Sequence, residues 1–219
     1  MYISPSRHRS NDVVSGLLHL VGVGLSIAVL VVLIVLGARE GSTLHIVGYV
    51  LYGTGLILLY LASASYHLLP ESFLRLKRIA QRLDHAMIYV LIAATYMPIT
   101  FIVLDGGWRW SMFGVIWGLA ILGFTIKLLA LHLPSSLSMG LYLVMGWLIA
   151  IAFSSLVQNM TAASLWTLVA GGLSYTFGVV FFALEHILPP KKYFWMHEIF
   201  HVFVLGGSIL HTIVMFQIL

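Results

Sequence analysis

Two histidines four residues apart, His197 and His201, open the last apolar stretch of the chain. Residues four apart share one face of an α-helix, so both imidazoles can reach a single divalent ion. Such a pair supplies half of the four ligands that zinc takes in proteins. We predict His67 as the third ligand, because it lies at a matching depth at the end of another apolar stretch. The pattern therefore predicts a zinc site of three histidines.

Ser63 and Asp84 are predicted to act beside this site. Three imidazoles leave the fourth position of zinc for water, and zinc lowers the pKa of such a water to about 7. Asp84, at the start of the third apolar stretch, would orient or deprotonate that water. Ser63 lies one helical turn from His67 and would donate a hydrogen bond to the developing oxyanion. The alternative for Asp84 is a charge at a helix N-terminus, where the helix dipole favours it.

The elements that carry these residues are predicted to span a membrane. Apolar residues make up 61% of the 219 residues and charged residues only 8%, against about a quarter charged in soluble proteins. A membrane helix needs about 20 apolar residues, so the chain has room for about seven spans and for no additional soluble domain. We predict an all-α integral membrane protein, a bundle of seven transmembrane helices forming one domain over residues 1–219. The predicted spans are approximately 13–36, 44–66, 83–104, 110–131, 139–157, 165–184 and 196–218.

Positive charges predict the orientation of this bundle. All but two of the eleven Lys and Arg residues fall at span ends on one side, and the exceptions are Arg39 and Arg109. Because cytoplasmic loops carry the excess of positive charge, we expect the N-terminus in the cytoplasm and the C-terminus outside. The residues on the cytoplasmic side are Arg7, Arg9, Arg75, Lys77, Arg78, Arg82, Lys127, Lys191 and Lys192. The cluster within 75–82 is expected to contact anionic lipid headgroups rather than nucleic acid.

Titratable residues also gather at the predicted cytoplasmic ends. Such residues are costly inside a membrane and mark functional sites by default. The alternative is that helix ends near water simply tolerate them, which explains Glu185 and His186 well but explains paired histidines poorly. We therefore predict a buried site within the cytoplasmic leaflet. The polar residues of this layer are Asp12, His19, Ser63, His67, Asp84, His85, Glu185, His186, His197, Glu198 and His201.

The absence of cysteine excludes thiolate ligands and disulfides, so any metal must bind histidines and carboxylates. His211 lies about 15 Å beyond His201 along a helix, at 1.5 Å per residue. That separation is too large for a shared ion, and we expect His211 to bond a neighbouring helix.

Three motifs resemble those of one membrane protein family. They are Ser63-x-x-x-His67, Arg82-Leu83-Asp84-His85 and His197-x-x-x-His201. Together they resemble the seven-span hemolysin III group of the progestin and adipoQ receptor family, within a wider superfamily that includes alkaline ceramidases. The resemblance implies zinc on the three motif histidines, a water held by the aspartate, a role for the serine, and hydrolysis of an amide bond in a lipid. It also implies a multi-pass protein of the plasma (inner) membrane of a bacterium.

The chain departs from the family pattern before the first span. The family often has two acidic residues there, followed by an Asn and a Thr-His pair, and only Asp12 and His19 correspond clearly. We therefore leave both residues out of the predicted metal shell.

The function predicted is a zinc-dependent, ceramidase-like hydrolase of lipid amides that influences membrane lipid homeostasis. One alternative is a zinc-stabilised membrane sensor without turnover. Another is an intramembrane metalloprotease, with Glu198 as general base and Asp105 as a further ligand. Asp105 lies at the external end of the third span, about 30 Å of hydrocarbon away, and Glu198 is equally explained as a first-turn acid of its helix. The family name refers to cytolysis, but so apolar a bundle offers no polar-lined pore.

Overall fold

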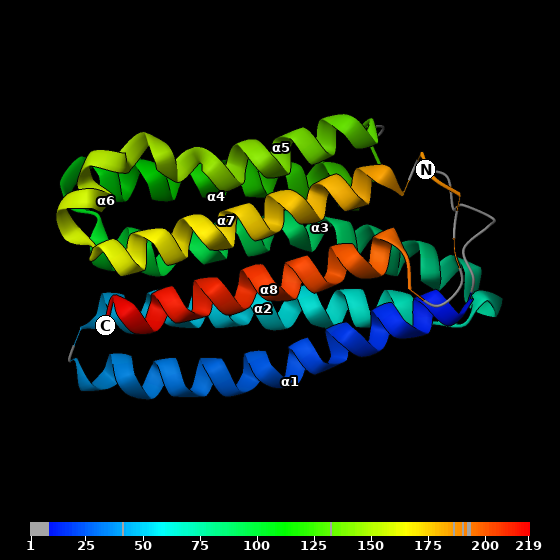
Figure 1. The fold of residues 1–219 in the computed structure, drawn as a ribbon, viewed down its shortest axis with the longest axis horizontal. Coiled ribbons are helices and arrows are strands. Elements are labelled where there is room, and N and C mark those ends of the chain that lie inside the picture. The colour runs from blue at the N-terminus through cyan, green and yellow to red at the C-terminus, as the bar shows by residue number, and fades with distance from the viewer. Residues whose placement is uncertain (1–8, 41, 132, 186, 190, 192–193) are drawn as a thin grey trace.

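The computed structural model describes residues 9–40, 42–131, 133–185, 187–189, 191 and 194–219. Arg7, His186 and Lys192, which entered the predictions above, lie outside the described residues. Every regular element in the described part is a helix, in agreement with the predicted class (Figure 1). The long helices are α1 (Arg9–Arg39), α2 (Thr43–Leu68), α3 (Leu74–Pro98), α4 (Gly106–Leu128), α5 (Ser135–Trp147), α7 (Ala162–Leu184) and α8 (Met196–Gln217). The shorter elements are η1 (Glu71–Phe73), η2 (Ile99–Val103), η3 (Leu148–Ala152) and α6 (Phe153–Asn159).

Within the described residues, seven segments are long and apolar enough to cross a membrane, as the sequence predicts. The largest difference in bounds is at the third segment, Glu71–Val103, which begins well before the predicted residue 83. Its first two turns alternate outward-facing side chains such as Arg75 and Arg78 with the buried Lys77. A hydropathy pattern misses such a stretch because its charges lower the mean hydropathy, although the helix is continuous.

Two of the spans depart from regular α-helix. Pro98, which lacks a backbone N–H, ends α3, and the span continues as the π-helical turn η2. The fifth span changes to the 3-10 turn η3 after Trp147. Here the Tyr96 hydroxyl donates to the Met145 carbonyl at 2.5 Å and accepts from the Ile149 amide at 2.9 Å. Because lipid offers backbone groups no partners, this side chain supplies them where the helix changes its pitch.

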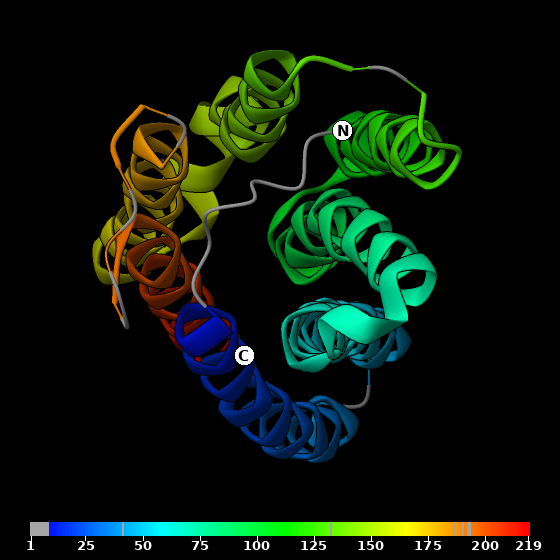
Figure 2. The same cartoon turned by 90° about the vertical axis from the view of Figure 1, so that its right-hand side faces the viewer.

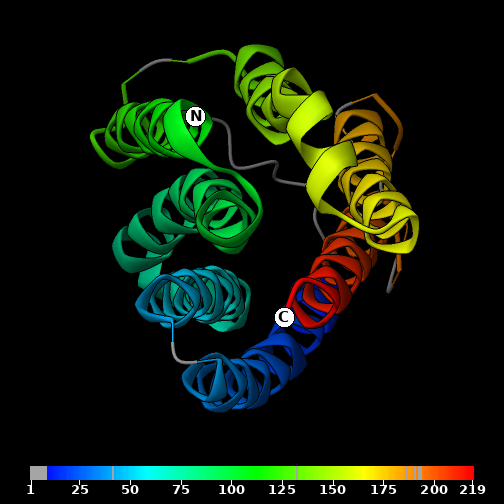
Figure 3. The ribbon, with the colours of Figure 1, turned by 90° about the vertical axis from the view of Figure 1, so that its left-hand side faces the viewer.

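The long helices surround a central region. Viewed along the bundle, α1, α2, α3, α5, α7 and α8 follow one another around a ring, and α4 packs against α3 (Figure 2 and Figure 3). α3 is the most buried span, whereas α1 exposes large apolar residues such as Val21 and Leu25 to the surroundings. The end of α2, the start of α3, the end of α7 and the start of α8 lie at one end of the bundle (Figure 1). The polar residues at these helix ends are therefore brought into one layer, opposite the C-terminus.

Candidate metal centre

Three buried histidines meet at this end of the bundle. His67 comes from the last turn of α2, and His197 and His201 come from the first two turns of α8. One ring nitrogen of each lies within 4.8 Å of the others. Two imidazole nitrogens that each lie about 2 Å from one zinc ion are at most about 4 Å apart, so these nitrogens lie close to the separation that a shared ion requires. The predicted ligands are therefore brought together as a candidate metal site.

The orientation of the rings suits a shared ion. The His67 ring stands at 71° to the His197 ring and at 68° to the His201 ring, with centroids 5.2 and 5.0 Å apart. The rings of His197 and His201 are inclined at 56°. Ligands of a tetrahedral ion approach it from separate directions, and these rings do not stack on one another. The inclined rings are therefore compatible with a shared ion, and edge-to-face contacts of this kind also stabilise the group without one.

Two carboxylates from other helices hold the Nδ1 atoms of these histidines. Asp12 Oδ1 of α1 lies 3.1 Å from His67 Nδ1, and Glu185 Oε2 at the end of α7 lies 2.7 Å from His197 Nδ1. A neutral imidazole that donates from Nδ1 to a carboxylate presents Nε2 to a metal, with raised basicity. Carboxylate–histidine pairs of this kind surround metal ions in many proteins. The sequence predicts both acids in this layer but does not predict this role for them.

Lys77 extends the Asp12 contact. Its Nζ donates to Asp12 Oδ2 at 3.1 Å and also to the Glu71 carboxylate. The Lys77 side chain is buried, whereas Arg75 and Arg78 are exposed and Arg82 is half-buried. The ammonium of Lys77 thus points into the protein, and the expected contacts with anionic headgroups are left to the three arginines.

Glu198 joins the first helix to the last. Its side chain is fully buried, and Oε1 accepts a hydrogen bond from Ser15 Oγ at 3.0 Å. Oε2 accepts from Asn11 Nδ2 at 3.1 Å and from the Trp195 amide at 2.7 Å. The last contact caps the start of α8, as a capping glutamate does. Both carboxylate oxygens are engaged in fixing α1 and α8, which argues against Glu198 as the base of a metalloprotease.

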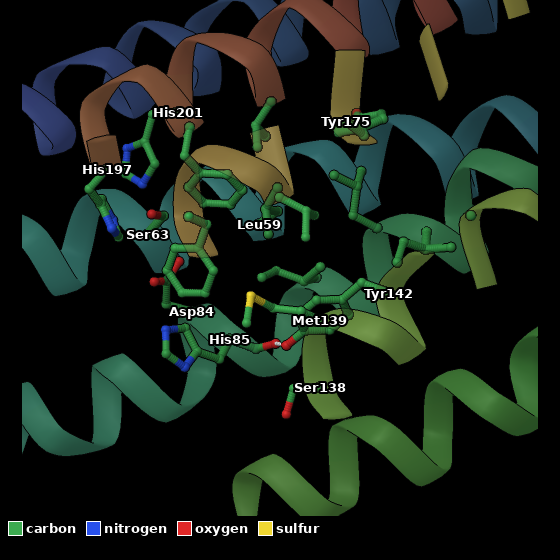
Figure 4. Close-up of a pocket in the computed structure, with 18 of the residues that line it drawn as sticks. Leu59, Ser63, Asp84, His85, Ser138, Met139, Tyr142, Tyr175, His197 and His201 are labelled. Carbon is green, nitrogen blue, oxygen red and sulfur yellow. Dashed lines mark hydrogen bonds between the residues drawn. The ribbon is translucent and has the colours of Figure 1, made fainter. Parts of the chain in front are cut away.

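Ser63 and Asp84 lie beside the histidines. Both are buried, and both face the same space as His197 and His201 in Figure 4. Among the described residues, Ser63 Oγ has no hydrogen-bond partner. A buried hydroxyl in this state indicates a place for a water molecule or a ligand group. Both residues are therefore placed where the sequence analysis expects them.

His19 and His211 lie outside the three-histidine group. The His19 ring stacks on His201, with centroids 3.9 Å apart and planes at 12°, and so restricts the rotation of that ring. His211 stacks on Tyr175 of α7, with centroids 5.4 Å apart. It thus packs on a neighbouring helix, away from the candidate metal site.

A cavity of about 1120 Å³ opens beside this site. Its lining extends from Asp84 of α3 to Ile99, the first residue of η2, a rise of about 22 Å at 1.5 Å per residue. Polar side chains line the end that holds the histidines. Most side chains of the deeper part are apolar, among them Leu59, Leu91, Ile92, Ile99, Leu168 and Val204, and Thr95, Tyr175 and His211 are polar exceptions. A cavity with this division can hold a molecule with a polar head and a long apolar tail.

Comparison with known proteins identifies the family of the chain. The family model described as Haemolysin-III related matches residues 7–212. Hemolysin-3 of Bacillus cereus is 36% identical over 197 residues, which are 90% of this chain and 86% of that protein. The Hemolysin-3 homolog of Bacillus subtilis (strain 168) is also 36% identical over 197 residues, 90% of this chain and 89% of the relative. The Monocyte to macrophage differentiation factor of Homo sapiens is 33% identical over 165 residues, 74% of this chain and 66% of the human protein. The chain, with its seven apolar helices, belongs to the haemolysin III-related family of multi-pass membrane proteins.

Proposed function

We propose that the protein is a zinc-dependent hydrolase that cleaves an amide bond of a membrane lipid in the cytoplasmic leaflet and so influences lipid homeostasis. The observation that carries the proposal is the three-histidine group beside a cavity that His197 and His201 line and whose deeper part is mostly apolar. Zinc suits an all-histidine site, because catalytic zinc takes three protein ligands and keeps one position open. The choice of an amide bond follows the resemblance to ceramidase-like relatives.

The residues of the site have separate roles in this proposal. A zinc ion held by His67, His197 and His201 would supply a Lewis acid for the carbonyl and lower the pKa of a water. Asp84 orients the attacking water and accepts its proton. Ser63 Oγ–H donates a hydrogen bond to the carbonyl oxygen as negative charge develops there. The water oxygen adds to the carbonyl carbon, the C–N bond breaks, and the leaving nitrogen takes the proton from Asp84, so that a fatty acid and an amine are formed.

The shape of the cavity supports a lipid substrate. Each methylene group that enters the apolar part gains about 0.8 kcal/mol by leaving water. The polar end is where an amide and its headgroup can find hydrogen-bonding partners. A substrate with its tail along Leu91 and Ile99 therefore has its amide near the histidines.

A second candidate function has no turnover. The histidines and their carboxylates come from α1, α2, α7 and α8, so an ion here would join four helices and stabilise the bundle as a sensor of the membrane. The protease alternative is disfavoured, because the Glu198 carboxylate is engaged with α1 and Asp105 is at the start of α4, at the other end of the bundle.

The first experiment measures the metal content of the detergent-purified protein by plasma mass spectrometry. We expect about one zinc per chain, lost in His197→Ala and kept in Asp84→Ala. The second experiment measures release of fatty acid from lipid amides in pure liposomes. Turnover that needs both His67 and Asp84 supports the hydrolase, and equal rates in wild type, His67→Ala and Asp84→Ala refute it. Metal binding without hydrolysis of any lipid amide would support the second candidate function, the zinc-stabilised membrane sensor.

We also propose that the N-terminus is cytoplasmic, that the C-terminus is outside, and that the protein resides in the plasma (inner) membrane of a bacterium. The excess of Lys and Arg at one end of the bundle supports this orientation. Reporters fused to the C-terminus test it, since an external C-terminus activates a reporter that works only outside the cytoplasm.

A further inference from the structure

Lys127 brings a positive charge to the cavity, away from the histidines. It lies in the last turn of α4, is half-buried, and is part of the cavity lining. Its Nζ donates to the hydroxyl of the buried Ser138 at 2.6 Å. Among the described residues, no carboxylate lies within ion-pair distance of Lys127, whereas Lys77 contacts both Asp12 and Glu71. Lys127 thus differs from Lys77, the other lysine of the cavity lining, because Lys127 donates to a neutral hydroxyl.

The place of Lys127 is close to the proposed reaction site. Ser138 and Tyr142 lie one turn apart on α5, and the Tyr142 hydroxyl donates to the His85 carbonyl at 3.1 Å. His85 follows Asp84 directly, and Figure 4 shows Ser138 and Tyr142 on the same side of the cavity as this pair. Four residues of helix rise by about 6 Å. Lys127 and Asp84 are thus linked through α5, because Ser138 contacts Lys127 and Tyr142, one turn further, contacts the backbone next to Asp84.

The cavity lining beside Lys127 is mostly apolar, with Ser135 and Ser138 as its polar members. The neighbouring cavity lining includes Ala130, Leu131, Leu133, Pro134 and Met139. A cation beside such side chains loses hydration and is stabilised when an anion joins it. The helix dipole and the cytoplasmic excess of positive charge both favour a lysine at this place in the sequence. Neither effect requires the side chain to turn toward Ser138 and the cavity, so they leave its direction unexplained.

We propose that Lys127 binds an anionic headgroup of the substrate, so that the site acts on an acylated amine that carries a carboxylate or a phosphate. The inference rests on the proposed amide hydrolase and specifies its substrate class. In this arrangement the acyl chain lies along the apolar depth, the amide lies at the histidines, and the negative group of the amine lies at Lys127.

The test measures binding rather than turnover, in nanodiscs of neutral lipid, with Asp84→Asn as a background that keeps the ligands intact. The probes share one acyl chain: N-oleoylethanolamine is neutral, its phosphate ester carries a phosphate, and N-oleoylglycine carries a carboxylate. We expect at least one anionic probe to bind about tenfold or more tightly than the neutral one, the gain of a charge-assisted hydrogen bond. Lys127→Met should remove this preference without changing the affinity for N-oleoylethanolamine, and Lys127→Arg should keep it.

Arg78→Met is the matched control, because Arg78 is an exposed cation at the same end of the bundle and does not line this cavity. It should leave the preference unchanged. Equal binding of all three probes overturns the proposal, as does a preference that survives Lys127→Met or disappears equally in Arg78→Met. Oleate is the last probe: if its binding depends on Lys127 as strongly, the lysine binds a product carboxylate and the headgroup assignment is wrong. Failure of the hydrolase proposal gives a different result. In that case the preference for anionic probes is intact, but the wild-type protein hydrolyses none of the amides.

Discussion

The contact between Asp12 and His67 makes a quantitative prediction about metal affinity. Asp12 accepts from two groups, with Oδ1 at 3.1 Å from His67 Nδ1 and Oδ2 at 3.1 Å from Lys77 Nζ. An asparagine at this position has the same shape but only one acceptor oxygen. In Asp12→Asn, the amide NH₂ must therefore face either the imidazole N–H or the ammonium, and the negative charge is lost.

We expect Asp12→Asn to weaken zinc binding by about 10- to 100-fold, the usual effect of removing a carboxylate behind a metal-bound histidine. This factor corresponds to about 1.4 to 2.7 kcal/mol of binding free energy. The assay is competition for zinc with a fluorescent chelator in detergent, at fixed pH. Circular dichroism at the same protein concentration checks that the helices are retained.

Asp105→Asn is the matched control, since Asp105 pairs with Arg109 at 2.7 Å at the start of α4 and is exposed. It should leave the zinc affinity unchanged. If Asp12→Asn fails to fold, Glu185→Gln tests the same reasoning through His197. A zinc affinity within twofold of wild type in a folded Asp12→Asn or Glu185→Gln protein would refute the role of these carboxylates.

Three further predictions concern catalysis and the bundle. Asp84→Ala should keep its zinc yet lower the rate of amide hydrolysis by about 10²- to 10⁴-fold, the contribution of a general base. Single-turnover release of fatty acid measures this rate, and an unchanged rate would remove Asp84 from the mechanism. Glu198→Leu removes the acceptor shared by the Asn11 amide, the Ser15 hydroxyl and the Trp195 backbone N–H. It should lower the free energy of unfolding by about 1 to 3 kcal/mol, as measured by denaturant titration in detergent, while Glu198→Gln should lose less. Tyr96→Phe deprives the η3 turn of its hydroxyl partner and should lower the thermal midpoint, whereas a midpoint equal to that of wild type would show that the turn does not need this hydroxyl.

The sequence predicts much of this protein because several of its features are local. The length and apolarity of each stretch indicate seven spans, and these properties do not depend on what a helix packs against. The four-residue spacing of His197 and His201 is likewise a property of one helix. His67, Ser63 and Asp84 follow by counting depth from the membrane surface, and the structure places them in the expected layer.

Depth alone does not determine which side chains touch. Asp12 and Glu185 lie at the correct depth in the sequence analysis, but their contacts with His67 and His197 depend on how each helix is rotated about its own axis. The same holds for the inward direction of Lys77. It lies between two exposed neighbours on a stretch whose charges favour a surface position.

Tertiary structure alone decides the contacts made across the bundle. Glu198 meets Asn11 and Ser15 from the opposite end of the chain, and Tyr96 bonds the backbone of another span. Such pairs have no signature in spacing, because the rotation and register of one helix against another are set by the packing of all their side chains together. The sequence by itself determines the number of spans and the layer of the site, and the packing of the helices decides which carboxylate holds which histidine.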